Sequence, residues 1–461
     1  MKPIWAIATL TWKAAFRYRL FWVICLLLLA SVVGLPLILK HDGTARGFTQ
    51  ILLTYTLSAI SGLLGLCTLW LGCGTLARDI EECQMQLVAV KPVPRWKIWL
   101  GKWLGLATLA GAMLLLAGAS VYALLLYRAN QLPADQRETL FKEVLVARGS
   151  ARPPDFHEEI QAETDRRLRE RLAQQPELKA DLAEVRRQIE EQVKAEYQIV
   201  PPGYIKVWQV DLGLQRRFIA GRPMHLRIKF NAAATSESGT FTGLWQVGVP
   251  ETPKVWRSEP MSLAPDTYHE FEIPPDLWDA SGILTIAFLN ANETTLLFPL
   301  EDGIEVLYWQ GGFLLNYLRG LGIIYCWILL LATLGLSTAS FLSFPVAAFV
   351  SLAALTLVFG SGTIRTVVTE GTLLGWDPEA EAFSQTWIDK IGVPVFKGIW
   401  WVIQLAKGFS PIDALSTGRS VPWTELARAV AQIVILLGGA LATGGIWAFH
   451  RRELATATPL Q

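Results

Sequence analysis

The chain has 461 residues, of which 52% are hydrophobic, and it contains 19 tryptophans at a mean hydropathy of +0.34. Its formal net charge is only +1, so neither sign of charge predominates, and we expect no nucleic-acid partner. This composition argues against a soluble fold and is typical of a membrane protein.

Six stretches are apolar over about 20 residues, the length that a helix needs to cross a bilayer. These predicted spans cover residues 21–39, 52–76, 104–126, 321–340, 342–362 and 426–449. The fifth is the weakest, because only Phe341 separates it from the fourth and Pro345 falls in its first turn. We therefore expect a multi-pass α-helical membrane protein with six transmembrane helices.

An amphipathic segment precedes the first span. Ile4 and Ile7 fall on one side of a helix and Lys13 on the other, which predicts a helix lying on the membrane face, anchored by Trp5 and Trp12. The alternative is a cytoplasmic extension of the first span. That span is too long for a signal-peptide core and is expected to remain as a helix.

Basic residues are concentrated before the first span, between the second and third spans, and after the sixth. Cytoplasmic flanks of membrane spans carry the excess of lysine and arginine, so these three places should face the cytoplasm. An even number of spans puts all three on one side. We expect a protein of the cytoplasmic (inner) membrane with both termini in the cytoplasm.

The stretch between the second and third spans is charged and contains two prolines, Pro92 and Pro94. Each charge costs about 2.5–3.5 kcal/mol at the bilayer centre, so this stretch lies outside the lipid. Apolar residues recur in it at helical spacing: Ile80, Cys83, Leu87 and Val90. The pattern predicts a short amphipathic helix over 78–90 that ends before the prolines, and a second helix from Arg95 into the third span.

Three further basic residues are predicted to anchor the chain at lipid headgroups. Lys97 and Lys102 lie beside tryptophans in the predicted helix that starts at Arg95 and enters the third span. Long side chains at such a position reach toward the headgroups. Arg319 directly precedes the fourth span and should do the same on the outer face. The alternative for Arg319 is a role in gating.

The charged stretch resembles the coupling-helix region of bacterial type-2 permeases of ATP-binding cassette (ABC) transporters. In that family a charged helix, a "KPVSR"-like turn and a "GKxLG" start of the third span follow one another. The matching residues here are Arg78, Asp79, Ile80, Glu81, Leu87, Lys91, Pro92, Val93, Pro94, Arg95, Gly101, Lys102, Trp103, Leu104 and Gly105. Glu82 and Cys83 stand where glycine is common, Pro94 replaces a serine, and "HRREL" at 450–454 is a weaker second match.

The resemblance implies a permease subunit that moves a substrate across the membrane with ATP hydrolysed by a separate ATPase subunit. The residues expected to couple to this ATPase are Arg78, Asp79, Ile80, Glu81, Glu82, Leu87, Pro92, Pro94 and Arg95. The chain contains no G-x-x-x-x-G-K-[ST] phosphate loop, so ATP and Mg²⁺ would be bound by the partner and no cofactor by this chain. We also expect a homodimer, or a heterodimer with a related permease, surrounded by membrane lipid.

Residues 128–308 are expected outside the cytoplasm, inserted between the third and fourth spans. Residues 128–203 are charged and should form a helical stalk, whereas 204–308 alternate apolar and polar residues between turn signals, as in an antiparallel β-sandwich. This module could bind a sugar or another extracytoplasmic partner through exposed aromatics such as Trp245 or Trp256, or it could be a structural cap that covers the pore exit. Tryptophans also belong to the core of a sandwich. The insertion separates an N-terminal membrane half, 1–127, from a C-terminal half, 309–461, in which 380–407 should form outer interfacial helices.

Neither H-E-x-x-H nor G-x-S-x-G occurs, so no enzyme activity is expected from this chain. Two other functions stay open beside transport. The chain could be an ATPase-linked mechanotransmission protein that acts on an envelope partner through its outer domain, or a membrane-anchored binding protein without an ATPase. A continuous inner cavity or a lateral groove between subunits would favour transport, and a solidly packed interior would favour a relay. The scarcity of polar groups in spans two, three and six favours an amphipathic or lipid-like cargo.

Overall fold

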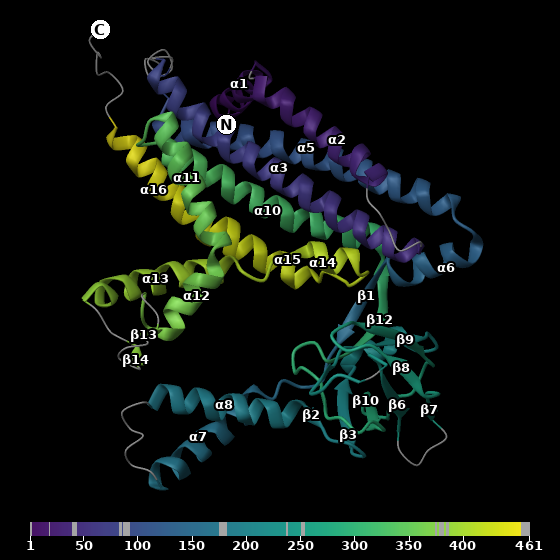
Figure 1. Cartoon of the computed structure of the whole chain (residues 1–461). Coiled ribbons are helices and arrows are strands. Elements are labelled where there is room, and N and C mark those ends of the chain that lie inside the picture. The colour runs from purple at the N-terminus through teal and green to yellow at the C-terminus, as the bar shows by residue number, and fades with distance from the viewer. Residues whose placement is uncertain are drawn as a thin grey trace. The chain divides into compact units, whose positions relative to one another are not determined.

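A computed structural model describes residues 2–17, 19–38, 44–82, 85, 93–174, 182–236, 238–249, 254–373, 376–377, 382–383 and 387–452 of the chain. It divides into two compact units (Figure 1). The helical unit consists of Met1–Leu145 and Gly312–Gln461, and the inserted unit of Val146–Gly311. The helical unit therefore brings together the two ends of the chain.

The helical unit is built on three long helices that lie side by side, α3, α5 and α10 (Figure 1). Its helices, in chain order, are α1 (Lys2–Arg17), α2 (Arg19–Ile38), α3 (Ala45–Glu81), α5 (Arg95–Gln131), α6 (Ala134–Glu143), α10 (Phe313–Ala339), α11 (Phe344–Phe359), α12 (Ser361–Glu370), α13 (Trp387–Ala406), α14 (Pro411–Ser416), α15 (Trp423–Ala429) and α16 (Gly439–Arg451). A π-helical segment, Val430–Gly438, joins α15 to α16, and two short strands, β13 (Trp376–Asp377) and β14 (Ala382–Phe383), form a hairpin.

Several of these helices are long and apolar enough to cross a membrane. Within the described residues they are Gly47–Glu81, Arg95–Gln131, Phe313–Ala339 and Trp423–Arg451. Two bent pairs, Lys2–Arg17 with Phe21–Leu35 and Phe344–Phe359 with Ser361–Thr369, bring the number to six if each is one span. The chain is thus a membrane protein with four to six candidate spans and a separate unit rich in β-strands.

The close crossing of α3 and α10 depends on glycine. A Cβ atom on Gly335 would lie 2.5 Å from the carbonyl oxygen of Leu69, and one on Gly72 would lie 3.1 Å from that of Ala332. Because neither glycine has a Cβ atom, the two backbones come into direct contact, as in other membrane helix pairs with small residues at the crossing.

Glycine residues also allow α1 and α5 to pack closely. A Cβ on Gly105 would lie 2.7 Å from Cβ of Thr11, and one on Gly101 would lie 2.8 Å from Cβ of Ile7. The indole Nε1 of Trp12 donates to Oγ1 of Thr108 on α5 at 2.9 Å. Trp12 is therefore half-buried against α5, whereas Trp5 is exposed.

A predicted interfacial segment, 380–407, coincides in part with α13. This helix carries exposed apolar side chains, among them Trp387, Ile391 and Trp401. Residues 380–381 and 384–386 of the predicted segment lie outside the described residues. Exposed tryptophans on an amphipathic helix are typical of a helix at the membrane interface. The interfacial location of this segment remains a prediction.

The inserted unit begins with a strand, β1 (Val146–Ala151), where the sequence indicated only helices. Two helices follow, α7 (His157–Gln174) and α8 (Leu182–Gln198), which pack through one apolar stripe. The buried residues of that stripe are Ile160, Leu168, Val185, Ile189 and Val193. The last three recur at helical spacing along α8.

The strands of the inserted unit form two larger sheets and a small one. One has the order β1-β12-β4-β9, the second β3-β10-β6-β7 with β8 also on β6, and the third β2-β11-β5. Their bounds are β2 (Ile199–Val200), β3 (Ile205–Asp211), β4 (Met224–Ile228), β5 (Asn231–Ala232), β6 (Phe241–Gly248), β7 (Val255–Arg257), β8 (Met261–Leu263), β9 (His269–Ile273), β10 (Ile283–Asn290), β11 (Leu296–Leu297) and β12 (Ile304–Gly312). Residues of both larger sheets share one apolar core, as in a β-sandwich.

Trp245 lies in that core. It is buried among Trp208, Phe288 and Phe298, and it is opposite Phe288 in the β6–β10 register. The idea that an exposed Trp245 binds a ligand is therefore wrong, because its indole is needed to fill the interior. Trp256 is half-buried against Phe271.

The glycine contacts between α1 and α5 predict a difference between two substitutions. Gly105→Ala should lower the midpoint of thermal unfolding of the purified chain, because the added methyl group forces α1 away from α5, at a cost of about 1–3 kcal/mol. Gly62→Ala on α3 is the matched control, since a Cβ there meets nothing within 4 Å. It should leave the midpoint unchanged or raise it, through better helix propensity. Equal midpoints for the two variants would contradict the packing.

Candidate functional site

The residues predicted to couple to an ATPase lie at the end of the helical unit where α3 ends and α5 begins. Arg78 to Glu81 form the last turn of α3, so this part of the expected helix over 78–90 continues the preceding long helix. Exposed Glu82 is the C-cap of α3, Pro94 is the N-cap of α5, and Arg95 is its first residue. Two predicted residues, Leu87 and Pro92, lie outside the described residues.

Arg95 caps the C-terminus of α16. Its Nη1 lies 3.0 Å from the carbonyl oxygen of Phe449 and 2.8 Å from those of His450 and Arg452. The last carbonyls of a helix have no partner within it and carry partial negative charge, so a guanidinium placed there is stabilising. The beginning of α5 is thereby joined to the end of the last helix.

Arg452 does the same for α10. Its Nη1 donates to the carbonyl oxygens of Ala339 at 3.1 Å and Leu342 at 3.3 Å, at the end of α10 and the turn that follows. Because Arg95 binds the Arg452 carbonyl, the two arginines form a chain of contacts from α5 through α16 to α10.

Residues of α3 hold the start of α11. Oε1 of Glu81 accepts a hydrogen bond at 2.8 Å from the backbone nitrogen of Phe344, the first residue of α11, whose N-cap Ser343 makes no side-chain cap bond. The guanidinium of Arg78 lies over the Phe344 ring, 4.3 Å from its centroid. A carboxylate at a helix N-terminus is favourable for the same electrostatic reason that an arginine is at a C-terminus. We call Arg78, Glu81, Arg95 and Arg452 the cap cluster.

A partly buried ion pair lies next to the cap cluster. Nζ of Lys102 donates to Oδ2 of Asp79 at 2.5 Å and to the carbonyl oxygen of Thr75 at 2.7 Å. Lys102 is buried between α3 and α5, so its ammonium binds protein groups in the position where the sequence suggested headgroups. Removing one partner of such a pair leaves an uncompensated charge, which makes the contact an obligatory tie between the two helices.

The other predicted anchors differ in their surroundings. Lys97 is half-exposed, with Nζ 5.4 Å from the Trp96 ring centroid, as expected for a side chain at a membrane surface. Arg319 is almost fully buried, far along α10 from the cap cluster. Ile80 is half-buried against the apolar cluster around Trp99.

An apolar pocket of about 600 Å³ opens between α3 and α11, close to this end of the unit. Its lining residues are Leu66, Leu69, Trp70, Cys73, Phe344, Pro345, Ala348, Phe349 and Leu352. Phe344 is both in the pocket wall and in contact with Arg78 and Glu81. Phe344 in the pocket wall therefore links the pocket to the cap cluster.

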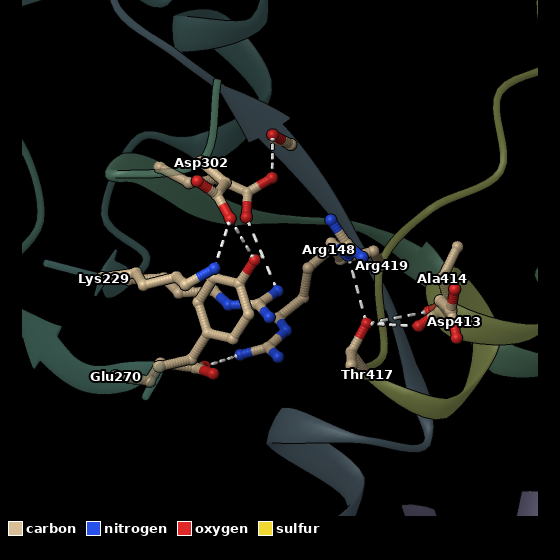
Figure 2. Close-up of polar contacts among 12 residues, drawn as sticks. Arg148, Lys229, Glu270, Asp302, Asp413, Ala414, Thr417 and Arg419 are labelled. Atoms are coloured by element: carbon tan, nitrogen blue, oxygen red, sulfur yellow. Dashed lines mark hydrogen bonds and ion pairs between the residues drawn. The ribbon is translucent and has the colours of Figure 1, made fainter. Parts of the chain in front are cut away.

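The inserted unit carries ion pairs on its four-stranded sheet. Figure 2 shows Arg148 directed at Glu270 and Lys229 at Asp302. The hydroxyl of Tyr268 also donates to Asp302, and the hydrogen bond of Lys229 to Asp302 raises the pKa of Lys229. These charges are balanced by their neighbours and stabilise the sheet rather than forming an open site.

Lys206 is the unusual charged residue of the inserted unit. It borders a pocket of about 370 Å³ together with Glu196, Tyr197 and Tyr204, and its Nζ donates to the carbonyl oxygens of Tyr197 and Ile199. Burial lowers the pKa of Lys206 to about 8. Because its desolvated ammonium is bonded to these two carbonyl oxygens, we interpret Lys206 as a structural contact at the end of α8.

The comparisons add no family assignment. The chain matches no protein-family model, no curated protein and no solved structure. Among the described residues, no group of three or more His, Cys, Asp or Glu side chains could hold a metal ion. The site is therefore interpreted from its own contacts.

Part of the site was not foreseen. The sequence pointed to Arg78, Glu81 and Arg95 as contacts for another protein, but not to their bonds within the chain. Arg452 lay in the weaker "HRREL" match without an assigned role, and Phe344 carried no signal. Helix-terminal caps between distant segments have no sequence period, so only the fold reveals them.

The cap on α16 predicts faster hydrogen exchange in Arg95→Gln. The shortened neutral side chain loses the three carbonyls, and hydrogen bonds to charged groups contribute about 1.5–3 kcal/mol, so amides in the last turn of α16 should exchange about tenfold faster or more. Hydrogen–deuterium exchange with mass spectrometry of the whole chain measures this. Arg451→Gln is the control, because exposed Arg451 lies in the same turn but packs on the Trp447 ring. Equal exchange in both variants would refute the cap.

The pKa of Lys206 predicts its reactivity with pH. Acetylation of this amine by acetic anhydride, followed by peptide mass spectrometry between pH 6 and 10, should show a midpoint near 8, well below the value of about 10.4 for lysine in model peptides. The folded state gives up this proton before the unfolded state does, so the stability of the inserted unit should rise with pH between about 8 and 10.4. A Lys206 without a midpoint below pH 10 would show that its ammonium is not desolvated.

Proposed function

We propose that the chain is the membrane-spanning permease subunit of an ABC transporter, coupled to a separate ATPase at the end that carries the cap cluster. The proposal rests on the resemblance of residues 78–105 to coupling regions and on one structural observation. The segment that would contact the ATPase is tied by Arg95 and Glu81 to the ends of α16 and α11. Force applied there would reach several candidate spans directly.

The location follows from the same proposal. The cap cluster would face the cytoplasm, where ATP is available, and both termini would lie on that side. ATP and Mg²⁺ would be bound by the ATPase subunit. The path would form between two copies of this chain, or between this chain and a related permease.

The apolar pocket supports transport of an amphipathic or lipid-like cargo. Its walls offer aliphatic and aromatic side chains, with Cys73 as the least apolar group, and suit hydrocarbon rather than a sugar or an ion. Since Phe344 links the pocket to the cap cluster, a movement of α3 against α11 would change its volume. A mechanotransmission protein acting on an envelope partner needs no such pocket, so transport is the better supported of the two functions.

Site-specific photo-cross-linking tests the ATPase contact. A p-benzoylphenylalanine in place of Glu82, which is exposed at the end of α3, should capture a partner that is itself labelled by 8-azido-ATP in intact membranes. The same substitution at Leu116, exposed in the middle of α5, should capture none, because that position would face lipid. Absence of an ATP-binding partner at Glu82, or equal capture at both positions, would overturn the proposal.

A further inference from the structure

Arg319 is a buried cation at the end of the helical unit opposite the cap cluster. It lies in the second turn of α10, 20 residues before Ala339, which is about 30 Å along the helix. Only 8% of its surface is exposed. A guanidinium withdrawn from water in this way normally has a carboxylate or several good acceptors beside it.

Among the described residues, the acceptors recorded for Arg319 are weak ones. Nε lies 3.4 Å from the carbonyl oxygen of Leu315, and Nη2 lies 3.5 Å from Oδ1 of Asn316, both at the outer limit of hydrogen bonding. Oδ1 of Asn316 already accepts a bond of 2.7 Å from the backbone nitrogen of Val421. In the part of the chain that the structure describes, no carboxylate forms an ion pair with Arg319.

The surroundings hold the guanidinium in place. Asn316 also donates to the carbonyl oxygen of Arg419 at 2.8 Å, which fixes the loop between α14 and α15 on α10. A Cβ on Gly322 would touch Leu426 at 3.1 Å, so α15 packs closely on the same turn of α10. The ring of Trp423, the first residue of α15, lies 5.5 Å from the guanidinium. These contacts hold Arg319 at a fixed position on α10, with its guanidinium beside the ring of Trp423.

The rim of the position is apolar and exposed. Leu315 is 52% exposed, Leu318 46% and Trp423 59%, and all three lie on helices of the candidate spans Phe313–Ala339 and Trp423–Arg451. On membrane helices such side chains face acyl chains, and tryptophan prefers the level of the headgroups. The anion that fits is therefore one attached to hydrocarbon.

We propose that Arg319 binds the phosphate of a membrane phospholipid, whose acyl chains lie along Leu315 and Leu318 while Trp423 covers the headgroup region. A guanidinium can bind two phosphate oxygens at once, which matches the donors that the protein leaves weakly engaged. The site depends on the membrane location of the helices and not on an ATPase, so failure of one proposal leaves the other standing.

Native mass spectrometry of the full purified chain tests the site with dioleoylphosphatidylglycerol as the probe. Wild-type protein should retain one lipid that Arg319→Gln retains at least fivefold less, and Arg319→Lys should be intermediate, since it keeps the charge but loses two-oxygen binding. Arg451→Gln should retain lipid like the wild type, although it also removes an arginine packed on tryptophan. Dioleoylglycerol, which lacks the phosphate, should not be retained.

Several outcomes would overturn the proposal. They are equal retention by wild type and Arg319→Gln, equal retention of dioleoylglycerol, and displacement of the lipid by millimolar inorganic phosphate, which would assign the site to the free ion. Loss of a dimer in Arg319→Gln without loss of lipid would assign the anion to a second copy of the chain. If Arg319→Gln does not elute as folded protein, the lipid retained by Arg319→Lys is compared with that of the wild type instead. Undiminished retention by Arg319→Lys would refute binding of two phosphate oxygens by Arg319.

Discussion

The helical unit depends on supplying partners for backbone groups at the ends of its helices. In lipid, or in a packed interior, a carbonyl or amide without a partner costs several kcal/mol, and every helix leaves four of each at its ends. At one end of this unit the partners come from distant parts of the chain. Arg95 supplies the end of α16, Arg452 the end of α10, and Glu81 the start of α11. The requirement to satisfy the backbone therefore joins α5, α16 and α10 in one set, and α3 and α11 in another, at the same end of the unit.

This form of attachment has a mechanical consequence. Apolar side chains slide past one another with little directional preference, whereas a charged side chain bonded to specific carbonyls fixes both distance and direction. The ion pair of Lys102 with Asp79 holds α3 and α5 together in the same way. Deeper in the unit, the glycine crossing of α3 and α10 allows backbone contact without polar ties. The unit is thus most strongly connected at its charged end.

Much of the fold could be predicted from the sequence, because its main signals are local. Apolar length marked the long helices, and alternation with turn residues marked the β-strands around Trp245. Strand β1 was missed because it is short, and buried Arg148 interrupts its apolar pattern by pairing with Glu270. Contacts such as Arg95 with α16 join residues more than 350 positions apart, and no local pattern encodes them.

Lys102 on α5 and Arg319 on α10 show why a charge at a membrane boundary cannot be interpreted from its position alone. From the sequence, Lys102 and Arg319 were both predicted to lie beside spans and to extend their side chains toward the headgroups. Lys102 is buried with a carboxylate and a carbonyl at short distance, so its charge is satisfied by the protein. Arg319 is equally buried, but its acceptors within the described part of the chain lie at 3.4 and 3.5 Å. The same residue class thus ties helices together at one end and leaves a place for an external anion at the other.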